Sequence, residues 1–161
     1  MDIIVQLIVS FFATAGIAII FNVPRKTLFH CGFVGVVGWL IYFVLTERGM
    51  DVVNASFFGS FVVAIVAHMY ARRFKMPMII FIVAGIIPLV PGGMAYNAMR
   101  NVVEDDYLQG LQYGLKAFLI TGAIVMGLVF AEVFMQLIFR AMYLSKTNIK
   151  KYTKNKASDV D

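Results

Sequence analysis

Two prolines and two glycines interrupt an apolar stretch in the middle of the sequence. Pro88, Pro91, Gly92 and Gly93 all lie within six residues. Proline lacks an N–H donor and glycine tolerates backbone angles that other residues avoid, so a membrane helix is predicted to unwind here. If the helix resumes at Met94, its free N–H groups and positive dipole end point at the break, where they can bind a carboxylate.

Polar side chains just after the break could complete such a site. Tyr96, Asn97 and Arg100 fall within the first two turns of the resumed helix. We therefore expect the break to form a substrate site for a small carboxylate. The predicted substrate-binding residues are Pro88, Pro91, Gly92, Gly93, Tyr96 and Asn97. The alternative is a proline kink followed by an extracellular loop that binds no ligand.

Two titratable residues lie inside other apolar stretches. Glu132 is an acidic residue well within its stretch, and an unpaired carboxylate in a membrane costs about 3 kcal/mol. His68 is at a similar predicted depth, and histidine can titrate near neutral pH. The two residues are candidates for proton coupling. Alternatively, Glu132 pairs structurally with a partner subunit, and His68 lies at the membrane interface beside Tyr70.

Signatures of enzymatic chemistry do not occur in the sequence. It has no H-E-x-x-H, G-x-S-x-G, P-loop or G-x-G-x-x-G motif, so hydrolytic, nucleotide-driven and dinucleotide-dependent activities have no visible site. Two separated histidines and one cysteine, Cys31, form no metal-ligand pattern. We expect no enzymatic activity, no catalytic residue, no metal and no cofactor.

The elements that must position these residues are apolar helices. Of the 161 residues, 61% are hydrophobic and 14% charged, whereas a soluble domain has about 45–50% apolar and about 25% charged residues. We predict an all-α integral membrane protein with about five transmembrane helices. Their ranges are about 3–21, 27–45, 52–71, 77–103 with the break at Pro88–Gly93, and 115–139, followed by a basic tail over 140–161. The first helix lacks a basic leader and a cleavage site, so we expect it to be retained.

Small and polar residues follow one side of the first predicted helix. Gln6, Ser10, Thr14, Ala18 and Asn22 recur every fourth residue. This pattern is typical of a helix-packing surface, and the alternative is the wall of a cavity. In the second predicted helix, glycines spaced by three residues would let another helix approach closely. These glycines are Gly32, Gly35 and Gly38.

The basic residues are unevenly distributed between alternate connections. Of the 14 Lys and Arg residues, eleven follow the first, third and fifth predicted helices, and three fall in the other segments. Because Lys and Arg are retained on the cytoplasmic side, the N-terminus is predicted outside and the C-terminus in the cytoplasm. The lysines of the tail are expected to contact anionic lipid headgroups, and nucleic-acid binding is not expected.

Three short motifs resemble those of the threonine/serine exporter family. They span residues 21–26, 71–77 and 87–93, and the last of these is the most specific. The chain is most similar to the small split subunit of that family, equivalent to the C-terminal membrane half of the fused exporters. The resemblance implies a proton-motive-force-driven exporter of threonine and serine, or of small dicarboxylates such as succinate, in a bacterial plasma membrane. It also implies a larger membrane subunit as partner.

Five transmembrane helices are few for a complete secondary transporter. An odd number of helices in each half gives the two halves opposite orientations, as in inverted-repeat transporters. We therefore expect the chain to form half of an exporter. The alternative is a homo-oligomeric channel or a scaffold subunit that does not transport.

Overall fold

The computed structural model describes the backbone of residues 3–158 and the side chains of residues 3–140. Its helices are α1 (Ile3–Ile20), α2 (Arg25–Glu47), α3 (Val52–Phe74), α4 (Met78–Ile86), the 3₁₀ turn η1 (Ile87–Leu89), α5 (Gly92–Val103) and α6 (Tyr107–Ser158). The predicted all-α fold is confirmed. The first two residues and the last three residues of the predicted tail lie outside the described part.

Four helices are long and apolar enough to cross a membrane. They are α1, α2, α3 and the part Tyr107–Arg140 of α6. The segment Met78–Leu89 and helix α5 qualify together as a fifth, bent by 52°. The prediction of about five transmembrane helices with a break in the fourth is therefore confirmed, while the orientation stays a prediction. Helix α6 begins earlier than the range predicted for the last transmembrane helix and continues through residues 140–158.

Short polar or proline-containing connections set the ends of the helices. Pro24 precedes α2 and Pro77 precedes α4, each with an extended backbone that starts the helix. The Asp51 carboxylate accepts a hydrogen bond of 3.2 Å from the Val53 N–H and so caps α3. Lys75, with φ of 53°, ends α3 in the left-handed conformation. These signals separate the apolar runs into distinct helices.

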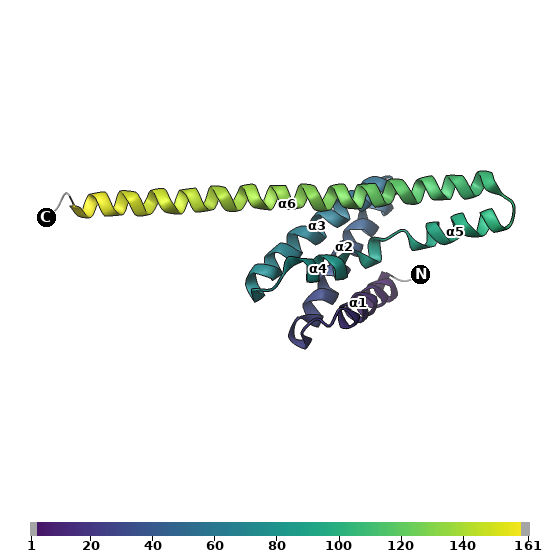
Figure 1. Ribbon diagram of the computed structural model, residues 1–161, viewed down its shortest axis with the longest axis horizontal. Helices are drawn as coiled ribbons and strands as arrows, with labels where there is room; N and C mark the ends of the chain where they lie inside the picture. The colour runs from purple at the N-terminus through teal and green to yellow at the C-terminus, as the bar shows by residue number, and fades with distance from the viewer. Residues whose placement is uncertain (1–2, 159–161) are drawn as a thin grey trace.

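Helices α1 to α4 form a bundle that packs on the middle of α6 (Figure 1). Helix α6 runs parallel to α3: Phe57 contacts Phe130 and Phe61 contacts Phe134, with ring centroids 6.0 and 6.1 Å apart. Beyond the bundle, α5 folds back along the first turns of α6 (Figure 1). In the opposite direction α6 extends well past the other helices.

Two clusters of buried residues hold the bundle together. The first cluster joins the four helices α1, α2, α3 and α4 near the turn between α1 and α2. It includes Ala18, Cys31, Ala67 and Phe81. The second joins α2, α3 and η1 to α6. Its members are Val34, Val63, Leu89, Ile120 and Ile124. The second cluster fixes the broken span against three continuous helices, and so fixes where the break lies.

Glycines bring the helix backbones close together in this bundle. A Cβ atom on Gly35 would collide with the Thr14 side chain of α1, and one on Gly38 would collide with Val63 of α3. On α6, a Cβ atom on Gly127 would lie 2.5 Å from the Phe57 carbonyl oxygen. The α2 glycines therefore form the packing surface that their spacing predicts.

Candidate functional site

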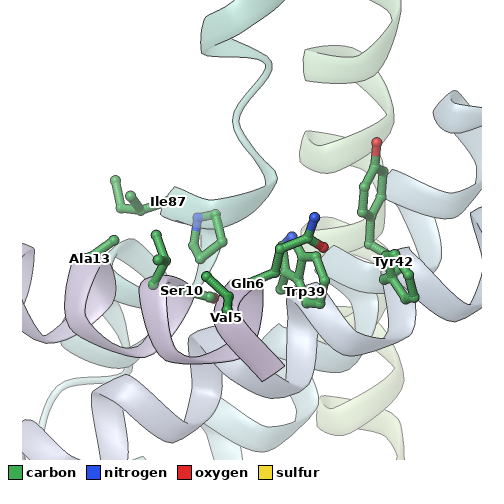
Figure 2. A pocket seen from close by; sticks show the side chains of 10 residues that line it. Val5, Gln6, Ser10, Ala13, Trp39, Tyr42 and Ile87 are labelled. Carbon is green, nitrogen blue, oxygen red and sulfur yellow. The ribbon is translucent and has the colours of Figure 1, made fainter. Parts of the chain in front are cut away.

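A cavity of about 560 Å³ lies between α1, α2 and η1 (Figure 2). Helix α1 contributes Gln6 and Ser10, α2 contributes Trp39 and Tyr42, and η1 contributes Pro88. The cavity thus lies where the broken span meets the polar side of the first helix. Its volume is within the range of about 300–1,000 Å³ that is usual for small-molecule sites.

The sequence of α2 explains why a cavity opens at this position. At Gly35 the absence of a side chain lets α1 approach until Thr14 fills the space. One turn further along α2, Trp39 replaces glycine, and Tyr42 and Phe43 follow. These aromatic side chains, in place of a glycine, form the α2 side of the cavity.

Two polar atoms on this side of α1 have no hydrogen-bond partner. They are the Gln6 Oε1 and Ser10 Oγ atoms, both buried. Ser10 is only 5% exposed. Its carbonyl oxygen already accepts a hydrogen bond of 2.7 Å from Thr14 Oγ1, whereas its hydroxyl is unpaired. Because buried polar atoms are nearly always hydrogen-bonded, these two atoms are exceptions on the side of α1 that borders the cavity.

The rest of the lining is uncharged, with aromatic residues from α2 and aliphatic residues from α1 and η1. No acidic or basic side chain is among the residues around the cavity. Trp39 and Phe43 stack with ring centroids 5.0 Å apart and planes 20° apart. Aromatic faces attract cations such as an ammonium group. The lining therefore includes the polar residues Gln6 and Ser10 on the α1 side and aromatic residues on the α2 side.

The break itself unwinds the backbone between η1 and α5. Val90 is extended, with φ of −64° and ψ of 129°, and the N–H of Gly92 donates to the Val90 carbonyl oxygen at 2.8 Å. Gly92 and Gly93 are exposed, and a Cβ atom on either would meet nothing within 4 Å. Of the predicted substrate-binding residues, Pro88 is the one that lines the cavity, whereas Pro91 lies at the start of α5 outside it.

The bend carries the remaining predicted substrate-binding residues away from this cavity. Tyr96 is 68% exposed on α5. Asn97 is half-buried, and its carbonyl oxygen accepts a hydrogen bond of 2.8 Å from Asn101 Nδ2. On the same helix Arg100 pairs with Glu104, with 2.9 Å between Nε and Oε1. Of the six predicted substrate-binding residues, Pro88 therefore lies at the cavity, and the other five lie at the start of α5 or within it.

The two candidates for proton coupling lie on helices that pack together. Glu132 is exposed on α6, and its Oε1 accepts a hydrogen bond of 3.4 Å from Gln136 Nε2. His68 is half-buried on α3, and its ring stacks on Phe139 with 5.7 Å between centroids. The Arg72 guanidinium covers the same phenyl ring, 3.0 Å from its centroid. The structure thus places Arg72 near His68, and leaves Glu132 on a surface that a partner could cover.

The residues that sequence reasoning missed are the aromatic ones on α2. Trp39 and Tyr42 give no signal alone, because aromatic residues are common in membrane helices. Their position follows from the register between α1 and α2. The two helices are antiparallel and Thr14 lies against Gly35, so Ser10 and Gln6, one and two turns further along, lie near Trp39 and Tyr42. No group of three or more His, Cys, Asp or Glu side chains able to hold a metal ion occurs among the described residues.

Apolar helices, a broken span and a cavity beside the break define a multi-pass membrane protein with features of secondary transporters. The family model described as "Threonine/Serine exporter, ThrE" matches residues 6–134, a range that includes Glu132 and all the residues around the cavity except Val5. The chain belongs to the threonine/serine exporter family, which is a family of transporters and not of enzymes. The resemblance seen in the three motifs is thereby confirmed.

A relative in Haemophilus influenzae carries the description "Uncharacterized protein". It is 32% identical to this chain over 121 residues, which are 70% of this chain and 41% of the relative. The chain therefore spans about two fifths of the length of that relative. No solved structure matches the chain.

Proposed function

We propose that the chain is a subunit of a secondary exporter of small amino acids such as threonine and serine, or of small dicarboxylates. The observation that carries this proposal is the family match over residues 6–134, because the matched part contains the broken span and all but one of the residues that line the cavity beside it. The substrate is proposed to cross the membrane at the break. A carboxylate group would meet the N-terminus of α5, with Pro91, Gly92, Gly93, Tyr96 and Asn97 around it.

Export is proposed to be driven by the proton motive force. Glu132, a carboxylate in the predicted membrane-spanning part of α6, is the proposed proton carrier, with His68 on the neighbouring helix as a second titratable group. Glu132 is exposed in the isolated chain, and a carboxylate cannot stably face lipid. This position supports a partner that covers the outer face of α6 in the assembled exporter.

The proposed partner is a larger membrane subunit of the same family, and the proposed location is a bacterial plasma membrane with the C-terminus in the cytoplasm. Helix α5 has no buried residue in the isolated chain. Met99 and Val103 on it are 69% and 79% exposed. In a membrane these exposed apolar side chains can pack either against lipid or against that subunit.

Reconstitution in proteoliposomes tests this proposal. The chain would be expressed alone and together with a larger membrane subunit of the same family, the proposed partner, and counterflow of labelled threonine, serine and succinate measured. We expect uptake only when both subunits are present. Transport by the chain alone would contradict the need for a partner. Absence of counterflow from a stable complex would favour a scaffold, and unselective ion conductance a channel.

A further inference from the structure

The bundle indicates where the hydrocarbon of the membrane ends on the side of the α2–α3 turn. Between Asp51 and Arg72, α3 has twenty residues without Asp, Glu, Lys or Arg, or about 30 Å of helix, which matches a hydrocarbon core of about 30 Å. Helix α6 runs parallel to α3, and a Cβ atom on Gly127 would lie 2.5 Å from the Phe57 carbonyl oxygen. The start of α3 is therefore about level with Gly122, five residues before Gly127.

Helix α6 begins well beyond this level. Its residues 107–121 precede Gly122 and make about 22 Å of helix, whereas the headgroup layer adds only about 5 to 7 Å on each side. This part of α6, with much of α5 beside it, extends past the bundle (Figure 1). Lipid chains therefore cannot cover most of its side chains.

Apolar side chains are nevertheless exposed along this part of α6. Four of them, each more than half exposed, are Leu108, Leu111, Leu115 and Phe118. Their alternating spacings of three and four residues are typical of a helix that packs on another helix. The last three also line an apolar groove of about 410 Å³ together with Met99 and Val102 of α5. Because a contiguous apolar surface is rarely left in water, this one indicates a protein contact.

The same repeat continues along α6 into the membrane. Its next positions, all of them exposed, are Gly122, Val125, Val129, Glu132 and Gln136. A carboxylate such as that of Glu132 cannot stably face lipid. Both ends of this stripe, which we call the α6 seam, therefore need a protein cover: the leucines beyond the membrane and the carboxylate within it.

The charges along α6 argue against a second copy of the chain as the cover. Copies in one membrane share one orientation, so two paired seams would place Glu132 against Glu132 in the hydrocarbon, where like charges repel. Pairing would also bring together two α5–α6 turns, each with three acidic residues and one basic residue. These are Glu104, Asp105, Asp106 and Arg100. A helix with a cation or a hydrogen-bond donor opposite Glu132 is complementary instead.

We propose that the α6 seam and the groove beside it bind one long α-helix of a different membrane subunit. This helix extends past the membrane on the side of the α2–α3 turn and packs apolar side chains on residues 108–118. It places a cation or a hydrogen-bond donor opposite Glu132. That this subunit belongs to an exporter rests on the proposed function, whereas the position and chemistry of the interface rest on the exposed side chains of α6.

Photo-crosslinking at single positions tests the seam. The crosslinking amino acid p-benzoylphenylalanine would be placed in turn along α6 of the full chain, in complex with a larger membrane subunit of the same family. We expect adducts with that subunit at positions 108, 111 and 115. Yields should be at least ten-fold lower at the matched controls on another side of the same turns, which are Gln109, Gln112 and Lys116.

Three results of the crosslinking would overturn the proposal. They are equal yields at seam and control positions, adducts between two copies of the chain, and no protein adduct at any seam position. The segment of the larger subunit that crosslinks at Val129 should contain a Lys, an Arg or a polar side chain with a donor. A wholly apolar segment would overturn the charge argument.

Leu111→Asp tests the strength of the interface. Leu111 is 62% exposed in the isolated chain, so its melting temperature should be retained, whereas the complex would bury an unpaired charge. We expect recovery of the complex to fall by at least about ten-fold. Gln112→Asp, the matched control, should leave recovery unchanged. Full recovery with Leu111→Asp would contradict the proposed contact.

Counterflow measurements separate this inference from the proposed function. If the complex transports serine but its crosslinks avoid the seam, the exporter function stands and the interface is wrong. If the crosslinks follow the seam but the complex moves none of threonine, serine and succinate, the interface stands and the exporter function is wrong.

Discussion

At the scale of single residues, Gly35 sets the distance between α1 and α2. We expect Gly35→Ala to destabilise the bundle by about 1 to 3 kcal/mol, because the added Cβ atom collides with Thr14. The apparent free energy of unfolding in mild detergent measures this effect. Gly16→Ala is the control, because a Cβ atom at Gly16 meets nothing within 4 Å. Thr14→Ala in the Gly35→Ala background should restore part of the loss, and a lack of rescue would contradict the assigned contact.

Glu132 is the residue on which the proposed coupling depends. Glu132→Gln keeps the size of the side chain and its contact with Gln136 but removes the titratable proton. We expect export driven by a pH gradient to be abolished, while counterflow, which needs no net proton movement, continues. Both are measured in proteoliposomes that hold the chain and its partner. Glu104→Gln, which alters an exposed carboxylate paired with Arg100, should leave both activities intact. Gradient-driven export by the Glu132→Gln variant would exclude the coupling role.

At the scale of elements, the broken span is the feature on which transport is expected to depend. Gly92 and Gly93 have open space around them, so leucine at both positions should be accommodated and the protein should still insert. Both residues lie in the first turn of α5, so the leucine side chains would cover the helix N-terminus where the substrate carboxylate is proposed to bind. We expect the double variant to lose transport while its yield and melting temperature are retained.

The control for the broken span is Gly122→Leu, which places the same side chain at another exposed glycine with nothing within 4 Å. Its transport should be normal. Normal transport by the variant with leucine at both 92 and 93 would show that the break need not be open.

The elements were largely predictable from the sequence, and the site only in part. Apolar length defines α1 to α3, and the proline and glycine spacing defines the break, because these are local properties of the chain. Which residues lie beside the break is not a local property of the sequence, because it depends on how the helices pack. Pro88 faces α1 and α2 because Leu89 is buried beside Val34 and Val63. The 52° bend then carries α5, and Tyr96 with it, alongside α6 and away from the cavity, and no spacing in the sequence shows this.

At the scale of the whole molecule, the orientation in the membrane is the prediction to test first. The charge distribution predicts that a reporter fused after Asp161 lies in the cytoplasm. A reporter inserted at Gly49, in the turn between α2 and α3, should lie outside. Alkaline phosphatase and green fluorescent protein fusions at both positions measure this. The opposite pattern would reverse the orientation, and the same location for both would contradict an odd number of spans between the two sites.

The length of α6 has a mechanical consequence. It contains 52 residues, or about 78 Å of helix at about 1.5 Å per residue, whereas a bilayer with its headgroups is about 45 Å thick. The part after Arg140 extends away from the bundle (Figure 1) for about 27 Å. A tilt of about 10° at the bundle would displace its far end by about 5 Å. Helix α6 can therefore act as a lever that makes rearrangements around Glu132 detectable outside the membrane.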